Sequence, residues 1–180
     1  WDYGNWIMYL AERPVVANNF QAGLEDAAKF YLSESEENAT SLLDARGSKY
    51  IFVDHSMAYG KLGALTTWAN EDLTSYFRAE DAGSEIQVTP TDRLFNMTLG
   101  KLYFFDGAET GHFRLIYESK TFLGESPAKS TVKIFEYVPG ALIKVRSGAD
   151  QNVGAVLNMT SNQDRRFIYA NDATQREGLF

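Results

Sequence analysis

The hydrophobic pattern of this 180-residue chain changes near residue 113, and this change limits the possible folds more than any other feature. Before that point, apolar side chains recur mostly at helical spacing. After it, they alternate with polar side chains over short runs, which is the period of strands with one buried face. The sequence therefore predicts an α+β or mixed α/β fold. Residues 1–110 are expected to form a helix-rich α/β core with a small sheet, and residues 111–180 a part rich in antiparallel β-strands.

The first part contains several helix signals and two strand signals. Apolar spacing predicts helices over residues 2–12, 24–33, 37–46, 55–70 and 91–103. Asp2 is expected to cap the first helix, and glycines at positions 60 and 63 are expected to break or kink the fourth. Strand signals cover residues 15–17 and 49–53. The strand–helix–strand order suggests a parallel sheet with helices packed on it.

The second part consists of strand-like runs separated by Gly, Pro, Ser or Asn. The runs cover residues 113–120, 131–138, 141–147, 155–161 and 166–171. The tight-turn sequence Val-Pro-Gly-Ala at 138–141 predicts a hairpin over 131–146. The polar tail 171–180 is expected to fray. At about 150 residues per domain, the whole chain is expected to be one soluble domain.

Composition excludes several classes of function. The chain has 17 basic and 24 acidic side chains and a net charge of −7, which disfavours a nucleic-acid binder or a polybasic lipid anchor. It has no cysteine, which excludes disulfides, thiolate metal sites and cysteine nucleophiles. No apolar run approaches the roughly 20 residues of a membrane-spanning helix, and no signal peptide opens the chain. Because the chain opens on Trp1 rather than Met, it is expected to be a piece of a longer polypeptide.

Three residues could share one face of a helix. Asp54, Met57 and Lys61 stand at positions i, i+3 and i+7, and Asp54 directly follows a strand signal. An acid, a flexible thioether and a base on one face could line a small pocket. The same spacing suits a helix cap, a core methionine and a solvated lysine, and residue types alone favour this second interpretation.

A second cluster opens the chain. The residues from Trp1 to Gly4 combine an indole, a carboxylate, a phenol and a flexible glycine, which could bind a small polar group against an apolar wall. The alternative is a terminal helix cap with aromatic packing. His55 and His112 each lack an acid or a second histidine at metal-ligand spacing, so a structural role is favoured for both. These features alone do not identify a complete active site.

The two clusters carry a resemblance. Residues 1–23, WDYGNWIMYLAERPVVANNFQAG, resemble the signature region of oligosaccharyltransferase catalytic subunits, the membrane enzymes of asparagine-linked glycosylation. Trp1 to Gly4 match the last four residues of the family hallmark Trp-Trp-Asp-Tyr-Gly, whose first Trp would immediately precede this chain. Residues 54–62 resemble the helix motif of archaeal members in its Asp-x-x-Met-x-x-x-Lys variant. Residues 132–141 are similar to the strand pair that follows the family's core. The chain resembles the C-terminal globular domain of a short archaeal, AglB-type enzyme.

The resemblance implies a role in acceptor recognition. The full enzyme would be a glycosyltransferase, a dolichyl-phosphooligosaccharide-protein glycotransferase, that transfers a glycan to Asn in Asn-X-Ser/Thr sequons. This domain would bind the Ser or Thr two positions after that Asn, the +2 residue. Trp1 and Asp2 would bind its hydroxyl, and Met57 would contact its methyl group. The supporting residues would be Tyr3, Gly4, Asp54 and Lys61. Whether Lys61 supplies charge to the pocket or pairs with Asp54 is left open by the sequence.

The resemblance also implies what this chain lacks. Catalytic residues and the ligands of a Mn²⁺ or Mg²⁺ ion would lie in an upstream multi-span membrane region, so this chain alone would be inactive. The partners would be an acceptor polypeptide and a dolichyl-linked oligosaccharide, with no nucleic acid, in a single-subunit enzyme. The domain would lie on the extracellular face of the cell membrane.

Two other functions stay open at this point. The chain could be a non-catalytic extracellular module that binds carbohydrate or peptide, or a purely structural α/β domain. Sequons for asparagine-linked glycosylation occur at Asn38, Asn96 and Asn158. Asn38 is the preferred candidate for carrying a glycan.

Overall fold

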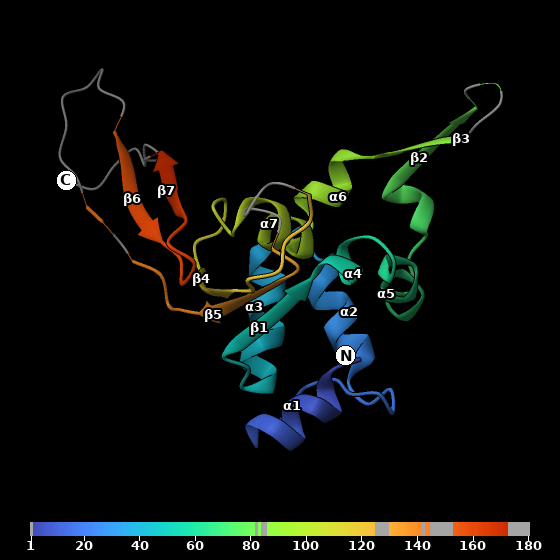
Figure 1. The fold of residues 1–180 in the computed structure, drawn as a ribbon, viewed down its shortest axis with the longest axis horizontal. Coiled ribbons are helices and arrows are strands. Elements are labelled where there is room, and N and C mark those ends of the chain that lie inside the picture. The colour runs from blue at the N-terminus through green and yellow to red at the C-terminus, as the bar shows by residue number, and fades with distance from the viewer. Residues whose placement is uncertain are drawn as a thin grey trace.

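A computed structural model describes residues 2–81, 83, 86–124, 130–141, 143–144 and 153–172. The α-helices are α1 (Gly4–Ala11), α2 (Leu24–Leu32), α3 (Glu36–Arg46), α4 (His55–Ala58), α5 (Leu62–Ala69), α6 (Asp92–Asn96) and α7 (Thr98–Phe105). The strands are β1 (Tyr50–Asp54), β2 (Phe77–Asp81), β3 (Ile86–Pro90), β4 (Phe113–Glu118), β5 (Val132–Tyr137), β6 (Gly154–Thr160) and β7 (Arg166–Asp172). The predicted class, a helix-rich core followed by antiparallel strands, is confirmed (Figure 1).

The central sheet joins the two parts of the chain. Its strand order is β1-β5-β4, and both pairings are antiparallel. The register places Asp54 opposite Val132. The parallel sheet expected from the strand–helix–strand order is therefore wrong, because the neighbour of β1 comes from the C-terminal part of the chain.

The expected strand over residues 15–17 is also wrong. This segment is part of the loop between α1 and α2, and two glycines pack closely against it. A Cβ atom at Gly4 would lie 2.3 Å from the carbonyl oxygen of Ala17, and one at Gly23 would lie 1.8 Å from that of Val16. The apolar run therefore serves a close backbone approach rather than sheet pairing.

The predicted hairpin over residues 131–146 is wrong as well. β5 is the central strand, and both of its edges are occupied, by β1 and by β4. No edge is free for a partner from residues 141–147, of which 142 and 145–147 lie outside the described residues. Most of the predicted fraying tail, residues 173–180, also lies outside them.

Two further hairpins extend from the body on different sides (Figure 1). β6 and β7 were predicted and pair antiparallel, with Asn158 opposite Ile168. β2 and β3 form an arm that the hydrophobic pattern did not predict. At the base of this arm, the guanidinium of Arg93 lies 4.8 Å from the ring centre of the buried Tyr76.

Two of the predicted helices are interrupted. The helix expected over 55–70 breaks between Ala58 and Leu62, at the position of Gly60, as predicted. The helix expected over 91–103 divides into α6 and α7 at Met97, whose backbone is extended (φ −68°, ψ 156°). Met97 is fully buried, so the interruption directs its side chain into the core.

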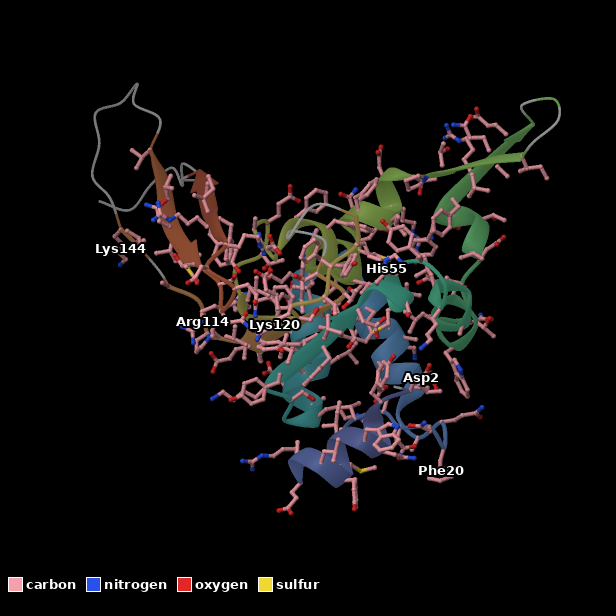
Figure 2. The ribbon with its side chains drawn as sticks, viewed as in Figure 1. Asp2, Phe20, His55, Arg114, Lys120 and Lys144 are labelled. Carbon is pink, nitrogen blue, oxygen red and sulfur yellow. The ribbon has the colours of Figure 1, made fainter. Side chains whose placement is uncertain are left out.

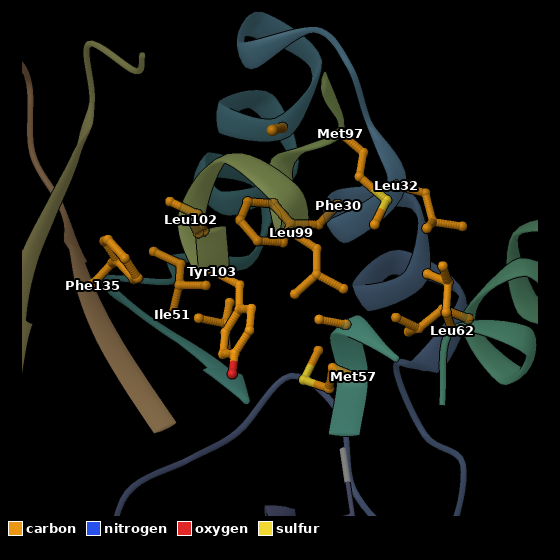
Figure 3. Packing of buried hydrophobic residues seen from close by; sticks show 14 of the residues in the cluster. Phe30, Leu32, Ile51, Met57, Leu62, Met97, Leu99, Leu102, Tyr103 and Phe135 are labelled. Atoms are coloured by element: carbon orange, nitrogen blue, oxygen red, sulfur yellow. The ribbon is translucent and has the colours of Figure 1, made fainter. Parts of the chain in front are cut away.

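The core lies between the central sheet and helices α2, α4, α5 and α7 (Figure 3). Its members include Phe30, Ile51, Met57, Leu99 and Phe135, all with at most 5% of their surface exposed. The core therefore holds the helix motif of residues 54–62 through Met57, Ala58 and Leu62.

Buried charges attach the β6–β7 hairpin to this core. Arg165 binds Asp106 at 2.8 and 3.0 Å and Glu118 at 2.7 to 3.1 Å. Lys133 of β5 is fully buried and donates to Asp106 at 2.7 Å and to the carbonyl oxygen of Tyr103 at 2.6 Å. Two basic and two acidic side chains thus compensate one another inside the protein.

Candidate functional site

The two motifs singled out in the sequence meet through an ion pair. Asp2 lies just before α1, and Lys61 lies in the break between α4 and α5; their charged groups are in direct contact. Asp2 was predicted to cap α1, and this is wrong: the N-cap of the helix is Tyr3, with no side-chain cap bond. The Asp2 carboxylate is directed toward Lys61 instead, which ties the start of the chain to the helix motif.

The surroundings of Lys61 favour its charged form. The hydrogen bond that Lys61 donates to Asp2 raises the pKa of Lys61, and the negative charges of Asp2 and Asp54 act in the same direction against partial burial. The Lys61 ammonium also lies 5.4 Å from the ring centre of Tyr3, a cation–π contact. Side-chain exposures of 31% for Lys61 and 38% for Asp2 leave the pair accessible to a ligand.

Asp54 caps α4, as one of the two interpretations predicted. Its Oδ1 accepts a hydrogen bond from the backbone N–H of Met57 at 2.9 Å. The alternative in which Lys61 pairs with Asp54 is not the geometry found, because the ammonium pairs with Asp2. Asp54 therefore sets the direction of the short helix and adds negative charge near Lys61.

Met57 is a core residue in this structure. Only 5% of its surface is exposed, and it packs in the main hydrophobic cluster (Figure 3). Its flexible thioether lies on the one-turn helix that leads to Lys61. The structure thus agrees with the core-methionine interpretation that the residue types favoured.

Gly4 is required by a close approach of two backbone segments. A Cβ atom there would lie 2.7 Å from the Cα of Asn18 as well as clashing with Ala17. The neighbouring Asn5 has a buried side-chain oxygen for which the described residues provide no hydrogen-bond donor. Trp1, the remaining residue of the opening motif, lies outside the described residues.

Two tyrosines that sequence reasoning missed lie close enough to Asp54 to be affected by its charge. The hydroxyl of Tyr31 donates to the carbonyl oxygen of Phe52 at 2.7 Å, and burial raises its pKa, with a smaller contribution from the charge of Asp54. Burial likewise raises the pKa of Tyr103 to about 12. No spacing rule could have found them, because they come from distant segments of the chain.

The two histidines have local partners. The Tyr103 hydroxyl is 3.5 Å from Nδ1 of His55, and the ring centres of His55 and Tyr59 are 4.5 Å apart (Figure 2 labels His55). His112 Nδ1 is 3.0 Å from Glu36, which also accepts the His112 backbone N–H at 2.8 Å. These contacts with Glu36 hold the segment around His112 against α3, in keeping with the structural role favoured for His112.

Two kinds of feature are absent from the part of the chain that the structure describes. It contains no group of three or more His, Asp or Glu side chains placed to hold a metal ion. Nor does any of its helices combine the length and the apolarity needed to cross a membrane. The described residues thus do not fit a Mn²⁺ or Mg²⁺ site.

Known proteins match both the sequence and the fold. Residues 1–58 match the family of the AglB core domain. The chain is 36% identical over 141 residues to dolichyl-phosphooligosaccharide-protein glycotransferase 2 of Archaeoglobus fulgidus, covering 76% of this chain and 21% of that protein. The chain thus spans about a fifth of the length of this relative.

Solved structures agree with these matches. The crystal structure of the C-terminal globular domain of an A. fulgidus oligosaccharyltransferase, AfAglB-S2, is 32% identical with a TM-score of 0.57, covering 76% of this chain and 80% of that one. An A. fulgidus oligosaccharyltransferase tethered to an acceptor peptide containing the NVT sequon has a TM-score of 0.79 at 22% identity, covering 97% of this chain and 31% of that one. Other similar structures contain Zn and sulfate, or an inhibitory peptide and a dolichol-phosphate.

Proposed function

Since the chain belongs to the AglB family of archaeal oligosaccharyltransferases and is similar to their C-terminal globular domains, we propose that it recognises the acceptor sequon Asn-X-Ser/Thr. It would do so as the C-terminal domain of an enzyme that transfers a lipid-linked oligosaccharide to asparagine. The observation that carries this proposal is the ion pair between Asp2 and Lys61. It unites the two motifs through which the chain resembles the family, at a partly exposed position.

The pair offers suitable chemistry for a Ser or Thr hydroxyl. A carboxylate accepts the O–H of the +2 residue, and an ammonium N–H can donate to the hydroxyl oxygen. Because Lys61 contacts Oδ2 of Asp2, Oδ1 can accept a hydrogen bond from the substrate's hydroxyl group. A peptide without the hydroxyl would leave these charged groups without their substrate partner, and such a loss lets a site reject the analogue strongly.

The remaining motif residues would shape the pocket. Asp54 fixes the direction of α4 through its cap bond, and Met57 would supply an apolar wall for the threonine methyl group, as the resemblance implies. Gly4 lets the segment that carries Asp2 approach the loop at Asn18. Trp1 would contribute its indole N–H to the hydroxyl, as the resemblance implies.

The other parts of the reaction belong to the rest of such a polypeptide. The dolichyl-linked oligosaccharide, the bond-forming groups and a Mn²⁺ or Mg²⁺ ion would be bound outside this chain. The chain would form one domain on the extracellular face of the cell membrane in a single-subunit enzyme. On its own it would bind acceptor peptide without transferring glycan.

The test restores the full-length enzyme and measures glycan transfer to an Asn-X-Thr peptide. Asp2→Asn removes the charge at constant size, and a hydrogen bond to a charged group contributes about 1.5–3 kcal/mol, so transfer efficiency should fall about ten- to a hundredfold. Glu80→Gln, on the exposed arm strand β2, is the matched control and should leave transfer unchanged. Equal transfer by Asp2→Asn and the control would contradict the proposal.

A further inference from the structure

The chain contains sequons of its own, which the proposed function does not use. They begin at Asn38, Asn96 and Asn158, and all three asparagines are exposed. The proposed acceptor pocket binds the hydroxyl of the +2 residue, so a folded chain can be modified only where that hydroxyl is accessible as well. The +2 residue therefore distinguishes the three sequons.

The fold occupies the threonine hydroxyl in two of the sequons. Thr98, two residues after Asn96, is 4% exposed, and its Oγ1 donates to the carbonyl oxygen of Ser33 at 2.8 Å. Asn38 lies in α3, where the partly buried Thr40 donates to a carbonyl oxygen one turn earlier at 3.1 Å. An enzyme could bind either threonine only after local unfolding.

The third sequon lies extended on strand β6. Asn158 and Thr160 are both exposed, and because they are two residues apart on a strand, their side chains share one face. Met159 between them is partly buried on the other face. Among the described strands β6 pairs only with β7, so its second edge is open. The folded domain thus presents the amide and the hydroxyl of this sequon together.

The surface around Asn158 is one that a glycan would protect. Val156 lies two residues earlier on the same face, and Ile168 lies directly opposite on β7. Their exposed fractions are 65% and 55%. An open strand edge with exposed apolar side chains can pair with another chain, and proteins commonly obstruct such edges. A bulky, hydrophilic glycan at this position would obstruct it.

The β6–β7 hairpin is held away from the acceptor site of its own chain. The backbone N–H of Leu115 donates to the Tyr169 hydroxyl at 3.0 Å, and that of Glu118 donates to Asn162 at 2.8 Å. These bonds attach the hairpin to β4, at one edge of the central sheet, whereas the Asp2 ion pair lies beyond β1, at the other edge. Figures 1 and 2 show the hairpin and Asp2 on different sides of the molecule.

We propose that Asn158 is a glycan acceptor of the folded domain and that a second copy of the enzyme modifies it. This proposal rests on the proposed function, because that function supplies the activity, and it favours Asn158 over the Asn38 preferred from the sequence. The donor is a dolichyl-linked oligosaccharide. The amide nitrogen of Asn158 forms a bond to the anomeric carbon of the first sugar and loses one proton. The bond from that carbon to the phosphate oxygen breaks, and the lipid phosphate leaves with the electron pair.

Site-resolved mass spectrometry of the full-length protein from its native membranes tests the site. The other two sequons of the chain are internal controls. The expected result is high glycan occupancy at Asn158 and low occupancy at Asn38 and Asn96. An unmodified Asn158, or occupancy there no higher than at the two controls, would overturn the proposal.

A reconstituted reaction tests the role of the second copy. Isotope-labelled full-length Asp2→Ala protein, produced without donor, is incubated with wild-type enzyme and dolichyl-linked oligosaccharide. The labelled chain should gain a glycan at Asn158. Adding Thr160→Val to it keeps the shape but removes the hydroxyl, so the rate of modification should fall about tenfold or more. No glycan on the labelled chain, or equal rates with and without Thr160→Val, would contradict the proposal.

The acceptor site and the proposed function fail separately. An unmodified Asn158 in an enzyme whose transfer to free peptide depends on Asp2 rejects only the acceptor site. A glycan at Asn158 together with peptide transfer that is independent of Asp2 rejects only the proposed function.

Discussion

The ammonium of Lys61 and the carboxylate of Asp2 form an ion pair that joins the break after α4 to the segment before α1. Neither residue belongs to a regular element, so the pair fixes two irregular segments to each other. Asp54 holds the intervening short helix by capping it. The arrangement turns two separate sequence motifs into one partly exposed site.

Replacing Lys61 tests whether it positions Asp2. Lys61→Gln removes the ion pair but keeps a polar side chain, and partly exposed pairs contribute about 0.2–1 kcal/mol. The expected result is a rise of up to about fivefold in the KM for an Asn-X-Thr peptide, with kcat nearly unchanged. Lys61→Arg keeps the positive charge, so its KM should be close to that of the wild type. Steady-state transfer by the full-length enzyme measures both constants, and an unchanged KM would rule out the positioning role.

Threonine should be preferred over serine as the +2 residue. A methyl group buried against Met57 is worth at most about 0.8 kcal/mol, which corresponds to a preference of up to about fourfold. Competition between Asn-X-Thr and Asn-X-Ser peptides at limiting concentration measures the ratio. Met57 is buried in the core, so a variant at this position must keep the side-chain volume. Met57→Leu meets this condition. Equal rates for both peptides in the wild type would exclude the methyl contact.

Acid should weaken the pairing of the central sheet. Hydrogen bonds from Arg114 and Lys49 hold the pKa of Glu136 below its ordinary value of 4.5. A carboxyl whose pKa is lowered by folding stabilises the protein above the unfolded value, and this stabilisation is lost as pH falls through the folded value. Melting temperatures of wild type and Glu136→Gln should differ most at pH 5–7 and converge below about pH 4.5. A difference independent of pH would show that the charge of Glu136 is not responsible.

Removing Arg165 should destabilise the protein strongly. Glu118 is fully buried and Asp106 is 8% exposed, so Arg165→Met removes the positive charge that pairs with both carboxylates and leaves Lys133 beside Asp106. Breaking such a network costs about 3–5 kcal/mol in the free energy of unfolding, measured by urea titration. Arg166→Met, at the exposed neighbouring position, should change it by less than about 0.5 kcal/mol. Similar losses for both variants would contradict the role assigned to the buried network.

Local sequence patterns predicted most elements of the fold. α3 begins with a cap by Ser35 and ends at Gly47, and β5 follows the alternation of its side chains. The β2–β3 arm was missed because it buries little: Ile86 is 74% exposed and Val88 is 59% exposed, so no apolar stripe marks it. The direction of the sheet was predicted wrongly because strand pairing depends on residues far apart in the chain.

The candidate site shows the same limit. The cap by Asp54 depends on a spacing of three residues and was among the predicted alternatives. The contact of Asp2 with Lys61 joins two segments that are far apart in the sequence. Local sequence rules instead predicted that Asp2 caps the first helix. The buried partners Arg165 and Lys133 come from different strands or loops, and their single positions in the sequence carry no pattern.

A double-mutant cycle between the enzyme and its substrate tests the central claim most directly. Transfer by full-length wild type and Asp2→Ala is measured with Asn-X-Thr and Asn-X-Val peptides. Valine has nearly the shape of threonine but carries a methyl group in place of the hydroxyl. If Asp2 binds the hydroxyl, each single change should lower transfer efficiency by about ten- to a hundredfold, and the two together should cost little more than one. If the two losses instead multiply, Asp2 does not contact the +2 residue, and the site proposed here is not the acceptor pocket.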